Sequence, residues 1–250
     1  MKVGATRVLI VGATSAIASA CARLWAGEKA HFVLMGRDAG KLERVASDLT
    51  VRGAAGVNTI AIDFNSTGEL PAAVDAAFTA LGGVDIALVA HGTLSDQARC
   101  QTDMDAALHE FASNATSHIA ILTLVANRMA AARAGTIAVI SSVAGDRGRA
   151  SNYVYGSAKA AITAFCEGLR MRLFSTGVHV LTIKPGPVAT PMTAGMKMPG
   201  FIVATPEGVA KDIVRAVRRK TATLYTPGFW RPIMFVIRAL PAAVLRRLPL

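Results

Sequence analysis

Cysteine is scarce in this sequence, and its three cysteines, Cys21, Cys100 and Cys166, lie far apart along the chain. Their odd number and the lack of a CxxC pair argue against a disulfide framework or a zinc site, and favour a reducing compartment. The five histidines show no HExxH or similar ligand spacing, so we predict no metal site.

Long apolar runs are also missing, although 52% of the residues are hydrophobic. No run of ~18 uncharged apolar residues occurs, so we expect no transmembrane helix. The N-terminal run VLIVGATSAIA resembles a signal peptide, but it passes from a strand-like stretch into a glycine turn and has no convincing cleavage site. We therefore take it as the first strand of a cytoplasmic protein.

Acidic residues are few: 16 Asp and Glu stand against 27 Lys and Arg, which gives a net charge of +11. One explanation is a solvated, arginine-rich surface. The other is attraction to an anionic partner such as a phosphorylated cofactor or phospholipid headgroups. No helix-turn-helix, zinc-finger or RNP-like pattern accompanies the charge, so we expect no nucleic-acid partner.

Short apolar runs alternate with helical segments along most of the chain. Strands are expected at 7–13, 31–37, 57–64, 84–92, 135–145, 178–186 and 222–228, and one long helix is expected at 105–134. This alternation predicts an α/β fold: a single-domain, doubly wound parallel sheet of about seven strands with helices on both faces. We assign residues 1–228 to a catalytic domain and 229–250 to a C-terminal tail.

The first predicted strand ends in GATSAIA, from Gly12 to Ala18. A glycine turn that leads straight into a helix presents free backbone N–H groups to a pyrophosphate, as in Rossmann folds. The residues expected at the phosphates are Gly12, Thr14, Ser15, Ala16 and Ile17. The alternative is a tight strand–helix turn that binds no ligand.

The second predicted strand ends in MGRD. An acid at this place in a dinucleotide fold selects NAD, but Gly36 stands there and Arg37 follows. A guanidinium suits a 2′-phosphate, so NADP(H) is favoured over NAD(H). Alternatively, Arg37 is an ordinary surface arginine. Asp38 could be the N-cap of the next helix.

A serine, a tyrosine and a lysine are spaced for carbonyl chemistry. Ser142 ends the fifth predicted strand, Tyr155 follows thirteen residues later, and Lys159 lies one helical turn further on, on the face of Tyr155 and not of Tyr153. The tyrosine would donate a proton, the lysine would lower its pKa, and the serine would hold the carbonyl oxygen. Tyr153 is assigned to packing or substrate contact.

With these motifs the sequence resembles the short-chain dehydrogenase/reductase family over nearly its whole length. The matching segments, in order, are GATSAIA, Asp63, VAHG, Asn114, ISS, YGSAK and IKPGPVATPM. The resemblance implies that Ser142, Tyr155 and Lys159 are catalytic and that Asn114 anchors a relay water with Lys159. Further cofactor contacts that it implies are Asp63, Phe64, Ala90, Gly92, Tyr155, Lys159, Pro185, Gly186 and Val188. The sequence departs from the family at Ala16 and Ala18, which replace glycines, and at VAHG, which replaces NNAG.

From about Ala138 onward the sequence is similar to one branch of that family, the decaprenylphosphoryl 2-keto-ribose reductases. This similarity rests on AGDRGRASNYVYGSAK and FWRPIMFVIRALPAAVLRRLP. It implies reduction of a keto-sugar carried on a polyprenyl phosphate at the inner face of the cytoplasmic membrane, in cell-wall biogenesis, with a flavin oxidase as a partner. The wider family resemblance implies a homo-oligomer. Other readings are a reductase of a steroid-like or acyl ketone, and a non-catalytic NADP-binding scaffold.

The tail after Gly228 combines apolar residues with four arginines, Arg231, Arg238, Arg246 and Arg247. We expect Pro232 and Pro241 to divide it into short helices. An apolar face with basic flanks favours contact with an anionic membrane surface, whereas packing over the active site or a partner subunit is the alternative. The loop 190–205 is predicted to be a substrate lid.

Overall fold

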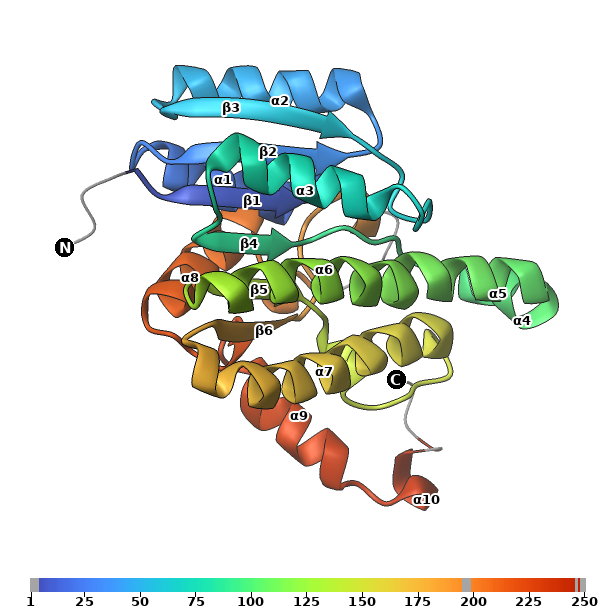
Figure 1. The fold of residues 1–250 in the computed structure, drawn as a ribbon. Helices are drawn as coiled ribbons and strands as arrows, with labels where there is room; N and C mark the ends of the chain where they lie inside the picture. The colour runs from blue at the N-terminus through green and yellow to red at the C-terminus, as the bar shows by residue number, and fades with distance from the viewer. Residues whose placement is uncertain (1–4, 195–198, 246, 248–250) are drawn as a thin grey trace.

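The computed structural model describes residues 5–194, 199–245 and 247. Its centre is one seven-stranded sheet in the order β3-β2-β1-β4-β5-β6-β7, with every neighbouring pair parallel (Figure 1). The strands are β1 (Arg7–Val11), β2 (His31–Gly36), β3 (Gly56–Ala61), β4 (Ile86–Val89), β5 (Thr136–Ile140), β6 (His179–Pro185) and β7 (Thr223–Thr226). The predicted α/β class and strand count are confirmed.

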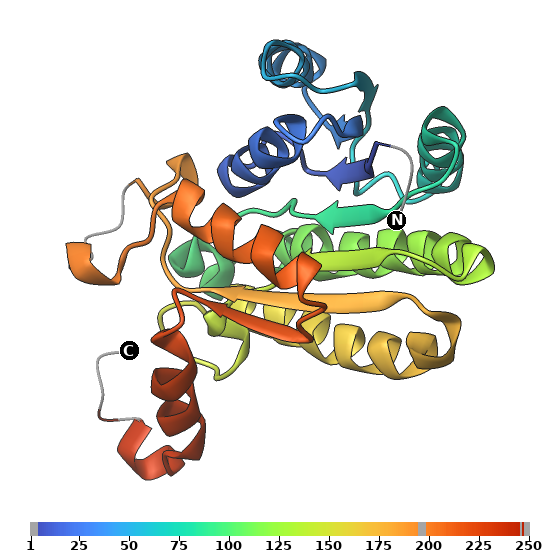
Figure 2. The same cartoon turned by 90° about the vertical axis from the view of Figure 1, so that its left-hand side faces the viewer.

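Helices cover both faces of the sheet, which explains why the central strands are almost wholly apolar. One face carries α1 (Ala16–Ala26), α2 (Ala39–Val51) and α8 (Pro206–Arg218), and the other carries α3 (Leu70–Leu81), α6 (Ser117–Ala132) and α7 (Tyr153–Leu173) (Figures 1 and 2). Leu9 and Val11 point to one of these two cores, and Val8 and Ile10 to the other, as strand alternation requires. The carboxyl ends of all seven strands therefore share one edge.

The predicted helix 105–134 is not a uniform α-helix. Beside the short α4 (Gln97–Thr102), the backbone is helical from α5 (Met104–Phe111) through a π-helical segment (Ala112–Thr116) into α6. Helix α6 ends at Ala132 and is capped by Arg133, whose φ of 51° is left-handed, so the predicted end at Ala134 was two residues too late. The π segment contains Asn114, one of the predicted site residues.

The C-terminal tail forms α9 (Trp230–Ala239) and α10 (Ala242–Leu245). Pro241 separates the two helices, as expected. Pro232 does not divide the tail, because it lies in the first turn of α9, where a missing N–H breaks no intrahelical bond. Trp230 and Met234 are buried against Val143, so α9 packs on the body of the fold. Within the described residues, no helix is both long and apolar enough to cross a membrane.

Candidate active site at the carboxyl edge of the sheet

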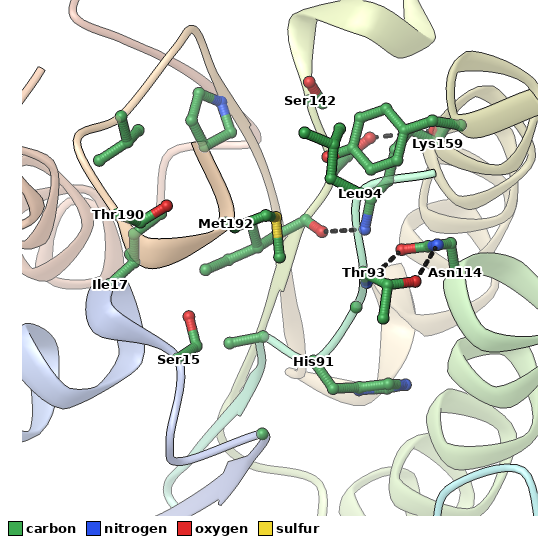
Figure 3. A pocket seen from close by; sticks show the side chains of 18 of the residues that line it. Ser15, Ile17, His91, Thr93, Leu94, Asn114, Ser142, Lys159, Thr190 and Met192 are labelled. Atoms are coloured by element: carbon green, nitrogen blue, oxygen red, sulfur yellow. Dashed lines mark hydrogen bonds between the residues drawn. The ribbon is translucent and has the colours of Figure 1, made fainter. Parts of the chain in front are cut away.

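A cavity of ≈ 530 Å³ opens at the carboxyl edge of the sheet. In Figure 3, Ser142, Lys159 and Asn114 lie on one side of it and Ser15 and Ile17 on the other. Every residue that the sequence assigned to catalysis or cofactor binding lines this cavity. They are Gly12, Thr14, Ser15, Ala16, Ile17, Arg37, Asp63, Phe64, Ala90, Gly92, Asn114, Ser142, Tyr155, Lys159, Pro185, Gly186 and Val188.

Ser142, Tyr155 and Lys159 come together where β5 meets the start of α7. The Ser142 hydroxyl accepts a hydrogen bond from the backbone N–H of Ala144 and is also hydrogen-bonded to Tyr155. The Lys159 Nζ lies 5.7 Å from the centre of the Tyr155 ring and donates to the Ile140 carbonyl at 3.3 Å. Tyr153 is 42% exposed and is absent from the cavity lining. The helical spacing thus separates the two tyrosines as predicted.

Burial dominates the ionisation of this cluster. It raises the pKa of Tyr155 to about 12, and the hydrogen bond with Ser142 opposes that rise. Burial also lowers the pKa of Lys159 to about 8. We expected Lys159 to lower the pKa of Tyr155, but desolvation outweighs the ammonium, which stands 5.7 Å from the ring centre. Lys159 is still mostly protonated at neutral pH and can supply the positive charge that the chemistry requires.

Asn114 is fully buried, and its side-chain amide is held on two sides. Its Oδ1 accepts from the backbone N–H of Thr93 at 3.1 Å, and its Nδ2 donates to Thr93 Oγ1 and to the Glu110 carbonyl. A Cβ built on Gly92 would lie 2.7 Å from Asn114 Oδ1 and 3.5 Å from Lys159 Nζ. Glycine therefore keeps open a space that both polar groups border. A relay water between Asn114 and Lys159 stays a prediction.

The other half of the cavity fits a dinucleotide phosphate. Gly12 has a φ of +85°, and a Cβ there would lie 2.5 Å from the His91 backbone nitrogen, so only glycine suits this turn. Helix α1 has no acidic residue in its first turn, and the side chain of its N-cap Ser15 makes no cap hydrogen bond, which leaves the first N–H groups for a ligand. Ala16 opens α1 and Ala18 is fully buried, so both methyl groups fit without disturbing the turn.

The sequence model described as short chain dehydrogenase matches residues 6–198, most of the chain. The chain belongs to the short-chain dehydrogenase family. It is 37% identical to an uncharacterized oxidoreductase of Mycobacterium tuberculosis over 246 residues, 98% of each chain. A short chain dehydrogenase from Burkholderia cenocepacia in complex with NADP has a similar fold, with a TM-score of 0.83, 18% identity and 100% of both chains covered. A solved short chain dehydrogenase/reductase family protein gives a TM-score of 0.77 at 26% identity, covering 90% of this chain and 97% of that one.

This short-chain dehydrogenase is therefore an NAD(P)-dependent oxidoreductase. Two histidines at its site were not predicted from the sequence. His91 and His118 stack with ring centroids 3.7 Å apart beside the cavity, and His91 Nε2 lies 2.9 Å from Ser117 Oγ. Burial and nearby Lys159 lower the pKa of His91 to about 3, so it is uncharged at neutral pH. The departure of VAHG from the family's NNAG was the available signal for this pair.

Arg149 and Trp230 also line the cavity of the dehydrogenase, although neither was predicted to be a site residue. Trp230 reaches the site from α9 and packs so closely on Gly186 that a Cβ there would collide with the indole. Arg149 Nη2 lies 3.8 Å from Met234 Sδ, also on α9. The tail thus packs beside the active site, which was the alternative to membrane contact in the sequence analysis. Its other face remains open.

The predicted lid at 190–205 is partly described. Thr190, Met192 and Thr193 line the cavity, and a bridge between Val188 and Ala204 closes the base of the loop. Residues 195–198 lie outside the described residues. Among the described residues, no cluster of His, Cys, Asp and Glu is suited to hold a metal ion.

Proposed function

We propose that this short-chain dehydrogenase reduces a ketone to an alcohol with NADPH. The observation that carries the proposal is the meeting of Ser142, Tyr155 and Lys159 on one wall of a cavity whose opposite wall fits a dinucleotide. The nicotinamide supplies the hydride that adds to the carbonyl carbon.

Tyr155 donates its phenolic proton to the carbonyl oxygen as negative charge develops there, which leaves an alcohol and a phenolate. Ser142, already hydrogen-bonded to Tyr155, holds that oxygen in place. Lys159 keeps its charge near neutral pH because its pKa is about 8, and it stabilises the phenolate until a proton returns. Asn114 and Lys159 both border the space at Gly92, where the proposed relay water would return that proton.

The two tyrosines provide a matched test of this assignment. Tyr155→Phe removes the proton donor and is expected to lower kcat by about 100-fold or more while NADPH binding persists. Tyr153→Phe alters an exposed ring on the same helix and should retain most activity. Steady-state ketone reduction and a fluorescence titration of NADPH measure the two effects. Comparable losses in both variants would show that the proton donor is wrongly assigned.

The preference for NADPH over NADH is proposed from Arg37, which lines the cavity where β2 ends. The neighbouring carboxylate of Asp38 accepts from the Lys41 N–H and caps α2, so it is occupied in the helix cap. The NADP bound in the Burkholderia relative is in keeping with this choice. Arg37→Ala should weaken NADPH by about 10- to 100-fold and leave NADH almost unchanged. Equal weakening of both cofactors would contradict a 2′-phosphate contact.

For the substrate, we propose a 2-keto-pentose linked to a polyprenyl phosphate. The support is the sequence similarity from Ala138 onward and a cavity with an apolar wall from Trp230 and Met192. The competing substrate is another hydrophobic ketone of steroid or acyl type. NADPH consumption with the lipid-linked keto-sugar, compared with soluble ketones, separates the two. If the enzyme turns over soluble ketones well but does not reduce the lipid-linked keto-sugar, this substrate assignment is refuted.

The outer face of α9 supports a proposed contact with an anionic membrane surface. Phe235 and Val236 are 77% and 57% exposed, and the exposed Arg231 and Arg238 lie on the same helix. Apolar side chains between arginines suit the headgroup region of anionic lipid. The protein should float with phosphatidylglycerol vesicles, and Phe235→Glu should reduce this binding severalfold. Equal binding to uncharged vesicles would contradict the electrostatic part of the proposal.

A further inference from the structure

Arg149 is a positive charge in the cavity wall without a carboxylate partner among the described residues. No ion pair links it to an acid there, and the hydrogen bond that its Nη2 makes is to the thioether of Met234, a weak acceptor. The nearest acid along the loop, Asp146, binds Lys184 with one oxygen and the Tyr225 hydroxyl with the other. The guanidinium therefore keeps most of its hydrogen-bonding capacity for a ligand.

The cavity lining around Arg149 is electropositive, although Asp146, which lies outside the lining, attracts the guanidinium. Of the described residues that line the cavity, the charged ones are Arg37, Asp63, Arg149 and Lys159. Arg149 lies in the loop after β5. Asp63 follows β3, which is the edge strand four positions away from β5 in the sheet order, so it lies far from Arg149. The substrate half of the cavity thus holds two cations and no lining carboxylate. A half-buried charge of this kind is stabilised when an anion binds beside it.

The cofactor phosphate expected at Arg37 is too far away to be that anion. Arg37 follows β2 and Arg149 follows β5, three strands apart in the order β2-β1-β4-β5. At ~4.8 Å per strand, this separation is about 14 Å. Arg149 lies in the loop that follows Ser142 and contacts α9, so its guanidinium belongs to the part of the cavity where the reacting ketone binds.

We propose that Arg149, supported by α9, binds a phosphate group of the substrate close to the reacting carbonyl. The planar guanidinium offers paired N–H donors that match two phosphate oxygens. This inference rests on the proposed function, because it places the anion next to Ser142 and Tyr155. It makes Arg149 a specificity-determining residue that selects phosphorylated ketones over neutral ones.

A second arginine provides the matched control. Arg147 lies in the same loop and binds the C-terminal end of α9, where its Nη2 donates to the carbonyl of the C-cap residue Leu240 at 3.3 Å. It does not line the cavity. Arg147→Ala and Arg149→Ala therefore remove the same charge and a comparable contact with α9, but only Arg149→Ala removes a cation from the cavity.

The test compares the binding of farnesyl phosphate, farnesol and inorganic phosphate to the NADPH-loaded protein by tryptophan fluorescence. The wild type and Arg147→Ala should prefer farnesyl phosphate to farnesol, and Arg149→Ala should weaken farnesyl phosphate by about 10- to 100-fold while farnesol is unaffected. Inorganic phosphate should bind more weakly than farnesyl phosphate, because it lacks the apolar chain. If inorganic phosphate binds as tightly as farnesyl phosphate, the proposal that Arg149 binds the phosphate of the substrate is wrong.

An unchanged preference in Arg149→Ala, or an equal loss in Arg147→Ala, would also overturn the inference. Circular dichroism establishes that each variant is folded, and Arg149→Lys should recover part of the preference if charge is what matters. The readout is binding, so it is independent of turnover. If farnesyl phosphate binding depends on Arg149 but the enzyme does not reduce the lipid-linked keto-sugar, only the proposed substrate is refuted. If the enzyme reduces that sugar and Arg149→Ala leaves the KM unchanged, only the phosphate contact is refuted.

Discussion

Replacing Lys159 by methionine should make the protein more stable although it removes a residue proposed to be catalytic. The side chain is 3% exposed, and burial lowers its pKa from 10.5 to about 8. That difference corresponds to about 3 kcal/mol of destabilisation by the protonated lysine at neutral pH. Methionine has a similar shape and no charge, but it loses the hydrogen bond to the Ile140 carbonyl, which costs about 1 kcal/mol. The expected net gain is about 2 kcal/mol.

The gain should depend on pH in a defined direction. Between pH 8 and 10.5 the unfolded chain binds a proton at Lys159 that the folded chain has released, so wild-type stability rises with pH across this window. The advantage of Lys159→Met should therefore be fully present below pH 8 and fade as the pH approaches 10.5. Urea unfolding of the cofactor-free protein at pH 7 and pH 9.5 measures it, and turnover should be lost at both pH values.

The exposed Lys211 on α8 gives the control for this experiment, because Lys211→Met should change the unfolding free energy little at either pH. A Lys159→Met variant that is less stable than the wild type at pH 7 would refute the reasoning. So would an advantage that grows between pH 7 and pH 9.5, since the sign of the proton linkage would then be reversed.

Two further predictions concern the frame of the site. Asp146→Ala should lower the free energy of unfolding by about 3–5 kcal/mol, because it leaves the buried Lys184 ammonium without its anion. Adding Lys184→Met should recover most of that loss, as measured by denaturant unfolding. A double variant that is less stable than Asp146→Ala alone would contradict this. Gly186→Ala should lower stability by about 1–3 kcal/mol through its collision with the Trp230 indole, and adding Trp230→Leu should relieve the effect. Purely additive losses in that pair would show that the two residues do not clash.

The order of strands and helices could be predicted because buried parallel strands leave a strong periodic signal. The expected strand 31–37 differs from β2 by one residue at its C-terminal end, and 178–186 differs from β6 by one residue at each end. The gathering of Ser142, Tyr155 and Lys159 also follows from local rules, since one end of a strand and one helix face determine it. The strand–helix turn forms with alanine at positions 16 and 18, because α1 begins at Ala16 and the Ala18 methyl group is buried in the core.

Features that depend on contacts between distant segments could not be predicted. The π-helical segment around Asn114 has no distinct composition, and the Asn114 side chain accepts from the backbone N–H of Thr93, 21 residues away, through a bond that no spacing rule indicates. Arg149 gains its role from Met234, which lies 85 residues away. The direction of the Tyr155 pKa was wrong for a similar reason, because the depth of burial is a property of the folded cavity rather than of the YxxxK spacing.

The placement of α9 sets the minimum length of the working enzyme. Trp230 lines the active-site cavity, Met234 packs in the cluster with Trp230 and Val143, and Arg147 donates to the Leu240 carbonyl at the end of the same ten-residue helix. A chain cut after β7 would keep the nucleotide half of the site but would open the chamber on its substrate side. The proposed membrane contact at Phe235 and the cavity wall at Trp230 lie on the same short helix, so a substitution that shifts α9 is expected to affect both.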